Sequence, residues 1–192
     1  ISIYGLSGKF WKWRMHGGAI TLADEFLQSK EPCDLILASD MLDLSTFLAL
    51  TRQHTAQIPT AIYFHENQLT YPWSPTDRDV AQQRDKHYGF INYVSALSAE
   101  AVLFNSRYHQ ASFLEALPKL LRHFPDYKEL DTVAQIKAKS QVLPLGLDLR
   151  RFDEFETPQL REKPLLLWAH RWEFDKGPED FFRAMEILSE RG

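Results

Sequence analysis

The sequence predicts an α/β fold in which helices flank a parallel sheet, and two observations carry that prediction. Short apolar runs alternate along the chain with segments whose apolar residues recur at helical spacing. The apolar runs are also continuous rather than alternating, which is typical of strands buried on both faces of a parallel sheet. Together these patterns favour a Rossmann-like parallel sheet flanked by helices.

The elements are expected in a regular β-α order. Compact apolar runs bounded by turn residues predict the strands, and apolar residues three and four positions apart predict the helices. The expected strands, in chain order, are 34–39, 60–64, 101–104, 141–145 and 164–169. The expected helices are 44–55, 77–97, 106–124 and a last one that starts at Pro178.

Local signals support several of these boundaries. Thr76 followed by Asp77 has the cap-then-acid spacing of a helix N-terminus. Pro118 is expected to interrupt the third helix, because proline removes a backbone donor. Pro178 suits the first position of the last helix, where its missing N–H costs nothing.

A charged, apolar-poor stretch over 153–163 is typical of a linker and predicts two domains. We expect a Rossmann-like domain over 1–158, lacking its first strand, and the first strand-helix unit of a second Rossmann-like domain over 159–192. One strand and one helix cannot form a core alone. We therefore expect an exposed apolar edge at 165–168 and, as its consequence, self-association of the truncated chain.

The composition narrows the function classes. The 192 residues carry 22 Lys and Arg against 26 Asp and Glu, for a net charge of −4, which argues against a protein that is basic overall and coats nucleic acid. The single cysteine, Cys33, excludes a disulfide framework within the chain. No apolar run approaches the ~18 residues of a membrane span, and no signal peptide is visible. A reducing, cytoplasmic setting is expected.

Polar residues follow four of the expected strands, where the ligands of such sheets bind. The clusters are His65-Glu66, Asn105-Ser106, Gly146 and His170-Arg171. Because the carboxyl ends of parallel strands share one edge, the sequence predicts a single site on that rim.

The stretch FHENQLTYPW, residues 64–73, carries more hydrogen-bonding chemistry than a turn requires. His65 is placed for general base catalysis or for binding a sugar hydroxyl, and Glu66 for acid-base or positioning work. Asn67 completes the candidate catalytic group. The alternative is a histidine that only hydrogen-bonds a loop. A zinc motif H-E-x-x-H is excluded because position 69 is Leu.

Arg171 and Lys176 stand between the last expected strand and the helix at Pro178. A helix N-terminus with two cations favours anion binding, and a diphosphate would suit it. The alternative is surface ion pairing of these cations with Glu173, Asp175 or Glu179.

Cations and aromatic residues interleave over 9–16, the stretch that most resembles a nucleic-acid surface. The candidate residues for binding a nucleic acid there, as the acceptor substrate, are Lys9, Trp11, Lys12, Trp13 and Arg14. The alternative is that the tryptophans pack inward and the cations are solvated.

Two further motifs carry weaker signals. Gly17-Gly18 is a candidate phosphate loop before a helix expected from Ala19, although G-x-G-x-x-G is absent. Asp77-Arg78-Asp79 matches a D-x-D metal motif, but acidic residues at a helix start stabilise the dipole, and that interpretation is favoured. No other metal-ligand spacing is present, so no metal is expected.

Several segments resemble a known family. Residues 141–152 are similar to the v-x-P-N-G-v-D-x-x-x-F segment of retaining GT-B glycosyltransferases, with Leu145 where that family often has Asn. FHENQLTYP, residues 90–106 and residues 165–182 resemble the tRNA-queuosine α-mannosyltransferases and their bacterial relatives. The resemblance covers nearly the whole chain, which would then be a GT-B N-terminal domain and the start of the second. We expect this piece to be inactive alone.

The resemblance implies transfer of mannose from GDP-mannose to queuosine in tRNA with retention, without a metal or other cofactor. His65 matches the histidine that touches the donor sugar, and Arg171 and Lys176 match the pair that neutralises the diphosphate. Asn105, Ser106 and Gly146 are expected on the donor side. Two alternatives stay open: a lipid, polysaccharide or small-metabolite acceptor, and a non-catalytic module that binds RNA or a partner.

Overall fold

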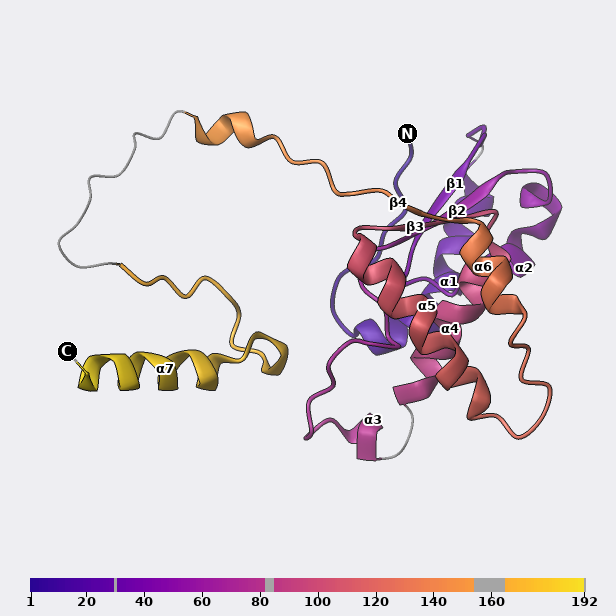
Figure 1. Ribbon diagram of the computed structural model, residues 1–192. Helices are drawn as coiled ribbons and strands as arrows, with labels where there is room; N and C mark the ends of the chain where they lie inside the picture. The colour runs from indigo at the N-terminus through magenta and orange to yellow at the C-terminus, as the bar shows by residue number, and fades with distance from the viewer. Residues whose placement is uncertain (30, 82–84, 154–164, 192) are drawn as a thin grey trace.

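The computed structural model contains a four-stranded parallel sheet with the strand order β1-β2-β3-β4 (Figure 1). The structure describes residues 1–29, 31–81, 85–153 and 165–191. The strands are β1 (Ile36–Ser39), β2 (Thr60–Phe64), β3 (Ala101–Phe104) and β4 (Ser140–Val142). Every neighbouring pair is parallel, which confirms the predicted α/β, Rossmann-like arrangement.

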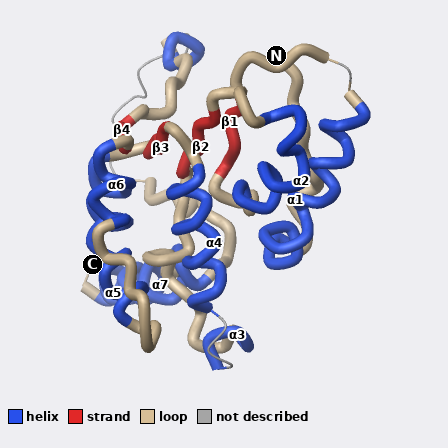
Figure 2. Tube along the Cα trace, turned by 90° about the vertical axis from the view of Figure 1, so that its right-hand side faces the viewer, coloured by secondary structure: helices blue, strands red, loops and turns tan. Residues whose placement is uncertain are grey.

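Helices precede, connect and follow the strands. They are α1 (Trp11–Gln28), α2 (Leu44–Thr55), α3 (Arg78–Ala81), α4 (Asp85–Ser98), α5 (Arg107–Arg122), α6 (Thr132–Ala138) and α7 (Pro178–Glu190), with short 3₁₀ helices η1 (Leu149–Phe152) and η2 (Phe174–Lys176). Helix α4 contacts α2 on one side and α5 and α6 on the other (Figure 2). Among the described helices, none has the length and apolarity that crossing a bilayer requires.

The core lies on one face of the sheet. Phe64 of β2 and Phe104 of β3 are fully buried, and their rings stack with centroids 5.2 Å apart. Phe113 of α5 packs against both rings. The opposite face is less covered, since Leu37 of β1 is 62% exposed. The expectation that the strands are buried on both faces is therefore wrong for β1, because the helices cover the face that carries Phe64 and Phe104 and leave Leu37 on the uncovered face.

Side-chain caps explain where two of the helices begin. The Asp43 carboxylate accepts a hydrogen bond from the Thr46 N–H at 3.0 Å, at the start of α2. The Ser106 hydroxyl accepts one from the His109 N–H at 3.1 Å, at the start of α5. Helix α5 continues through Pro118 to Arg122, so the expected interruption at Pro118 is wrong. Ser106 therefore both caps a helix and lies at the end of β3.

The structure corrects the sequence predictions at the N-terminal end and adds an element near β4. Gly17 and Gly18 lie buried inside α1, which begins at Trp11, so the predicted phosphate loop is wrong. A Cβ at Gly17 would come 2.6 Å from the Trp13 ring, which shows how closely that ring covers the helix. Helix α6 was not predicted. Strand β4 ends at Val142, short of the expected 145.

The C-terminal region forms less regular structure than predicted. Residues 165–169 are not a strand, while α7 begins at Pro178 as expected. Their leucines are exposed, as predicted, and self-association stays a prediction. The expected domain boundary falls within 154–164, outside the described residues. Part of the long helix expected over 77–97 is likewise undescribed, at 82–84, between α3 and α4.

Candidate functional site

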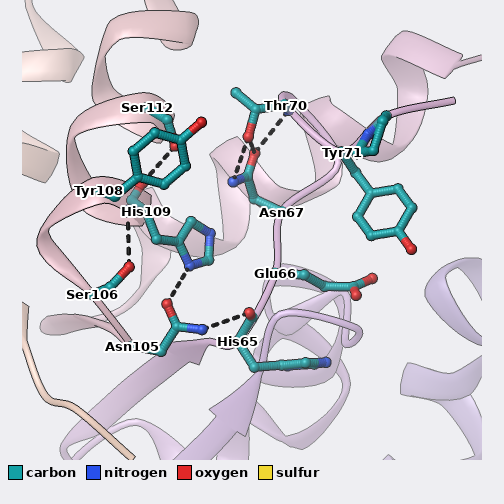
Figure 3. A pocket seen from close by; sticks show the side chains of 11 residues that line it. His65, Glu66, Asn67, Thr70, Tyr71, Asn105, Ser106, Tyr108, His109 and Ser112 are labelled. Carbon is teal, nitrogen blue, oxygen red and sulfur yellow. Dashed lines mark hydrogen bonds between the residues drawn. The ribbon is translucent and has the colours of Figure 1, made fainter. Parts of the chain in front are cut away.

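A pocket of about 360 Å³ opens where β2 and β3 end (Figure 3). Its lining residues are His65, Glu66, Asn67, Thr70, Tyr71, Pro72, Asn105, Ser106, Tyr108, His109 and Ser112. Five of these were predicted as site residues, and they come together because β2 and β3 are adjacent and parallel. Gly146 and Arg171 do not line it in the described part of the chain. Gly146 lies in the exposed segment after β4.

His65 is held by a buried carboxylate from the neighbouring strand. Asp40 directly follows β1 and is fully buried. Its Oδ1 contacts His65 Nδ1 and also accepts a hydrogen bond from the His65 backbone N–H at 3.1 Å. The hydrogen bond to Asp40 raises the pKa of the His65 imidazole, although partial burial opposes that rise. This arrangement favours the imidazolium form with one ring nitrogen fixed.

Glu66 projects into the pocket beside His65 (Figure 3). Its Oε1 accepts a hydrogen bond from Gln68 Nε2 at 3.1 Å. Burial, followed by the nearby Asp40 charge, raises the pKa of the Glu66 carboxyl. A carboxyl group whose pKa is raised in this way is suited to hold or exchange a proton.

Asn67 shapes the loop that carries these groups. Its Oδ1 accepts hydrogen bonds from the backbone N–H groups of Leu69 and Thr70, each at 3.0 Å. Its Nδ2 donates to the Thr70 hydroxyl at 3.0 Å. These contacts all lie within one turn, so the observed role of this side chain is to fix the loop.

Gln68 and Asn92 fasten the loop to the core. The Gln68 N–H donates to Asn92 Oδ1 at 2.8 Å, and Asn92 Nδ2 donates to the Asp40 carbonyl at 2.8 Å. Asn92 lies in α4 and is fully buried. One amide thus ties the ends of β1 and β2 together and keeps Asp40 and His65 in register.

Asn105 and His109 form the second wall of the pocket. Asn105 Nδ2 donates to the His65 carbonyl at 2.8 Å, and its Oδ1 lies 2.9 Å from His109 Nδ1. Burial lowers the pKa of the His109 imidazole, and the charge of His65 adds to the effect. The pocket therefore contains two imidazoles whose pKa values are shifted in opposite directions.

The two predicted anion-binding cations make the surface ion pairs that we considered as the alternative. Arg171 lies 3.2 Å from Glu173 and its side chain is 78% exposed. Lys176 lies 2.7 Å from Asp175 Oδ2, which also accepts a hydrogen bond from the Tyr71 hydroxyl at 3.0 Å. Burial, followed by the Asp175 contact, raises the pKa of Tyr71 to about 12. Lys176 is thus linked to the pocket wall through Asp175.

The predicted acceptor segment divides between inward and outward side chains. Trp11 packs against Trp73 and Tyr88, with ring centroids 6.1 and 5.3 Å away. Trp13 is 62% exposed, and Lys9 is also exposed. Inward packing therefore holds for one of the two tryptophans.

The D-x-D pair and Lys12 interact with each other. Lys12 lies 2.7 Å from Asp77 and 2.5 Å from Asp79. Asp77 also accepts a hydrogen bond from the Asp79 N–H at 2.9 Å, next to the start of α3. These contacts agree with the helix-start interpretation of the motif rather than with a metal site.

A second pocket, of about 320 Å³, lies between the N-terminal segment, α1 and the end of β1. Trp11 and Arg14 line it, as do Ser39 and Met41, the neighbours of Asp40. Arg14 Nη2 donates to the Ser7 hydroxyl at 3.3 Å, while its Nε is buried without a hydrogen-bond partner among the described residues. Asp40 therefore contacts a lining residue of the first pocket, His65, and lies in sequence between two lining residues of the second.

One group of residues has the geometry that could hold a cation. Across the described residues, Asp40, His65 and Glu66 are the one set of three whose potential ligand atoms lie within 4.8 Å of one another. Because Asp40 Oδ1 already contacts His65 Nδ1, a metal would have to compete with that pair. The expected metal independence stays a prediction.

Sequence reasoning missed Asp40 and His109. Asp40 carries the signal that identified His65, since it is the first residue after a strand. His109 lies four residues after Asn105, a spacing that places two side chains together at a helix start.

Comparisons with known proteins agree with one another. The sequence model of the tRNA-queuosine alpha-mannosyltransferase N-terminal family matches residues 1–147. A curated tRNA-queuosine alpha-mannosyltransferase of Drosophila melanogaster is 36% identical over 98% of this chain and 50% of its own length. The chain therefore spans about half the length of that relative.

Proposed function

Since this chain belongs to the tRNA-queuosine alpha-mannosyltransferase family, we propose that the full-length protein transfers mannose from GDP-mannose to queuosine in tRNA, with retention. The observation that carries this proposal is the pocket at the ends of β2 and β3. It presents an oriented imidazole, a carboxyl group and several amide and hydroxyl groups, which suits a ligand rich in hydroxyl groups.

His65 is the group that we assign to the donor sugar. Asp40 fixes its Nδ1 and stabilises the imidazolium, so its Nε2 can donate a hydrogen bond to a sugar oxygen. Such a bond would hold the sugar in the orientation needed while the sugar–phosphate bond breaks and negative charge develops on the diphosphate. Glu66, beside it, is placed to hold or exchange a proton.

Arg171, Lys176 and the N-terminus of α7 are assigned to the departing diphosphate. Cleavage of the sugar–phosphate bond places negative charge on that group, and fixed cations and a helix N-terminus stabilise such charge. Donor binding would replace the Glu173 and Asp175 carboxylates with phosphate oxygens as the partners of the two cations. With these positive groups in place, no metal ion is required.

Retention follows in this proposal from attack on the same face as departure. We identify no side chain as the nucleophile of a covalent intermediate. The acceptor hydroxyl then takes the position that the diphosphate oxygen leaves, and the diphosphate can receive the acceptor proton.

The second pocket is assigned to the tRNA acceptor. Trp11 and the apolar residues around it can pack against a nucleobase, and Arg14 can pair with a phosphate. Because Ser39 and Met41 line this pocket and flank Asp40, the acceptor would lie next to the Asp40–His65 pair.

Transfer assays with the full-length protein test the function. Radiolabelled mannose from GDP-mannose should reach queuosine-containing tRNA and not queuosine-free tRNA. His65→Ala should abolish transfer, while His54→Ala, an exposed histidine on α2, should leave it unchanged. Near-normal turnover by His65→Ala would refute the assigned site.

Two other results would favour the alternatives. Transfer to a lipid, polysaccharide or small metabolite, with none to either tRNA, would change the acceptor and keep the chemistry. Failure of the full-length protein to bind GDP-mannose in a calorimetric titration would favour a non-catalytic module. Arg14→Ala should raise KM for tRNA and leave the Kd for GDP-mannose unchanged, and the reverse pattern would reassign the second pocket.

A further inference from the structure

His109 lies inside the first pocket with one ring nitrogen unused. The residue is in the first turn of α5, only 8% exposed, and its ring lines the pocket (Figure 3). Nδ1 lies 2.9 Å from Asn105 Oδ1, while Nε2 is buried and has no hydrogen-bond partner in the described part of the chain. A buried polar atom of this kind calls for a ligand or a water molecule.

The hydrogen-bond chain fixes which nitrogen of His109 carries the proton. A backbone carbonyl can only accept, so the Asn105 atom 2.8 Å from the His65 carbonyl must be its NH₂ group. The Asn105 carbonyl oxygen therefore faces His109 Nδ1 and needs a donor there. Nδ1 must carry a hydrogen, which leaves Nε2 with a lone pair in the neutral ring.

The surroundings of His109 keep the ring neutral and in place. Phe64 and Phe104 meet it edge to face, with centroids 6.3 and 5.3 Å away. Burial among these rings lowers the pKa of His109, and the charge of His65 lowers it further, although the Asp40 charge acts in the opposite direction. The Nε2 atom is therefore an acceptor.

We propose that Nε2 of His109 binds the sugar in this pocket by accepting a hydrogen bond from one of its hydroxyl groups. This inference rests on the proposed function, because it takes a hexose as the ligand. His65 supplies the opposite polarity, since its imidazolium donates. The pocket would thus bind one sugar oxygen as an acceptor and another as a donor. That pattern selects for correctly placed hydroxyl groups, since a mismatch leaves a buried polar atom unpaired.

The proton position can be tested without any ligand. In the full-length protein labelled with ¹⁵N-histidine, long-range ¹H–¹⁵N correlation spectra distinguish an Nδ1–H ring from an Nε2–H ring. We expect His109 to be the Nδ1–H tautomer at neutral pH, and His109→Asn identifies its signals by their loss. An Nε2–H or a doubly protonated ring at neutral pH would overturn the proposal.

Two substitutions separate the roles of the two nitrogens. The amide of Asn in His109→Asn can donate to Asn105 in place of Nδ1 but removes the acceptor at the position of Nε2. Gln in His109→Gln can place an amide oxygen near the Nε2 position. We expect GDP-mannose affinity to fall about 3- to 10-fold in His109→Asn and less in His109→Gln. His123→Asn, at the exposed end of α5, is the control.

Donor analogues identify the hydroxyl group. In GDP-sugars with single hydroxyl groups replaced by fluorine, which cannot donate, one position should weaken binding to the wild-type protein and have no effect on His109→Asn. Equal losses in both proteins at every position would overturn the inference. If donor analogues behave as expected but no mannose reaches tRNA, the proposed acceptor fails and the role of His109 stands. If mannose transfer to tRNA proceeds while His109 is the Nε2–H tautomer, the role of His109 fails and the proposed function stands.

Discussion

Asp40 and His65 are joined twice, because one carboxylate oxygen of Asp40 contacts both the backbone N–H and the ring Nδ1 of His65. The two residues directly follow the neighbouring parallel strands β1 and β2. Asn92 of α4 donates to the Asp40 carbonyl and ties the pair to the helix layer. A buried acid therefore determines both where the His65 ring lies and which of its forms is favoured.

Asp40→Asn is expected to lower the pKa of His65. The neutral amide keeps the size of the carboxylate but no longer stabilises the imidazolium. Mannose transfer by the full-length protein should fall by about 10²-fold. NMR titration of the His65 ring, alongside steady-state rates, measures both effects. The control is Asp126→Asn, at an exposed position, which should change neither. An unaltered His65 pKa in Asp40→Asn would refute the positioning role.

Arg171→Ala and Lys176→Ala should each reduce the transfer rate by on the order of 10²–10³-fold, because each removes positive charge from the assigned diphosphate site. Affinity for GDP should fall as well, while affinity for tRNA should not. Arg183→Ala removes an exposed cation from α7 and serves as the matched control. Mannose-transfer rates and GDP titrations of the three variants test whether Arg171 and Lys176 bind the diphosphate. Equal, small effects would show that Arg171 and Lys176 make only surface ion pairs.

Hydrophobic patterning predicted strands correctly where the apolar run has a neighbouring strand to pair with in the described part of the chain. Residues 60–64 and 101–104 were predicted with the bounds that β2 and β3 have. Residues 165–169 are as apolar but form no strand. A strand requires a partner for its backbone groups, and an apolar run alone does not supply one.

The candidate site could be predicted only in part, because sequence identifies where strands end but not which side chains meet across them. His65 and Asn105 were found from their positions after strands. Asp40 has the same signal, yet its importance depends on contact with His65, 25 residues away. The helix expected from Ala19 begins eight residues earlier, at Trp11, because Gly17 and Gly18 are poor helix formers by propensity and tertiary packing overrides that propensity.

Phe104→Ala should destabilise the fold by about 3–5 kcal/mol, because the ring is fully buried and packs against Phe64 and Phe113. Urea unfolding of the full-length protein, followed by circular dichroism, measures the change. Tyr127→Ala, at a side chain that is 83% exposed, should alter the free energy of unfolding by less than about 0.5 kcal/mol. Similar midpoints for both variants would place Phe104 outside the core.

Donor binding should depend on pH through both histidines, with the strongest binding near their ordinary pKa of 6.5. The pKa of His109 is lowered, so its acceptor nitrogen becomes protonated only as the pH falls below 6.5. The pKa of His65 is raised, so its imidazolium is lost only as the pH rises through a value above 6.5. Affinity for GDP-mannose should therefore decline both as the pH falls below this optimum and as it rises above it.

The two limbs of this profile can be assigned by substitution. Asp40→Asn should move the alkaline decline to lower pH, because it lowers the pKa of His65. His109→Asn should weaken the acid decline, although Glu66, whose pKa is raised above 4.5, keeps a contribution there. GDP-mannose titrations across the pH range test this, with circular dichroism at each pH to verify that the protein remains folded. An acid limb that is unchanged in His109→Asn would assign that limb to Glu66 alone.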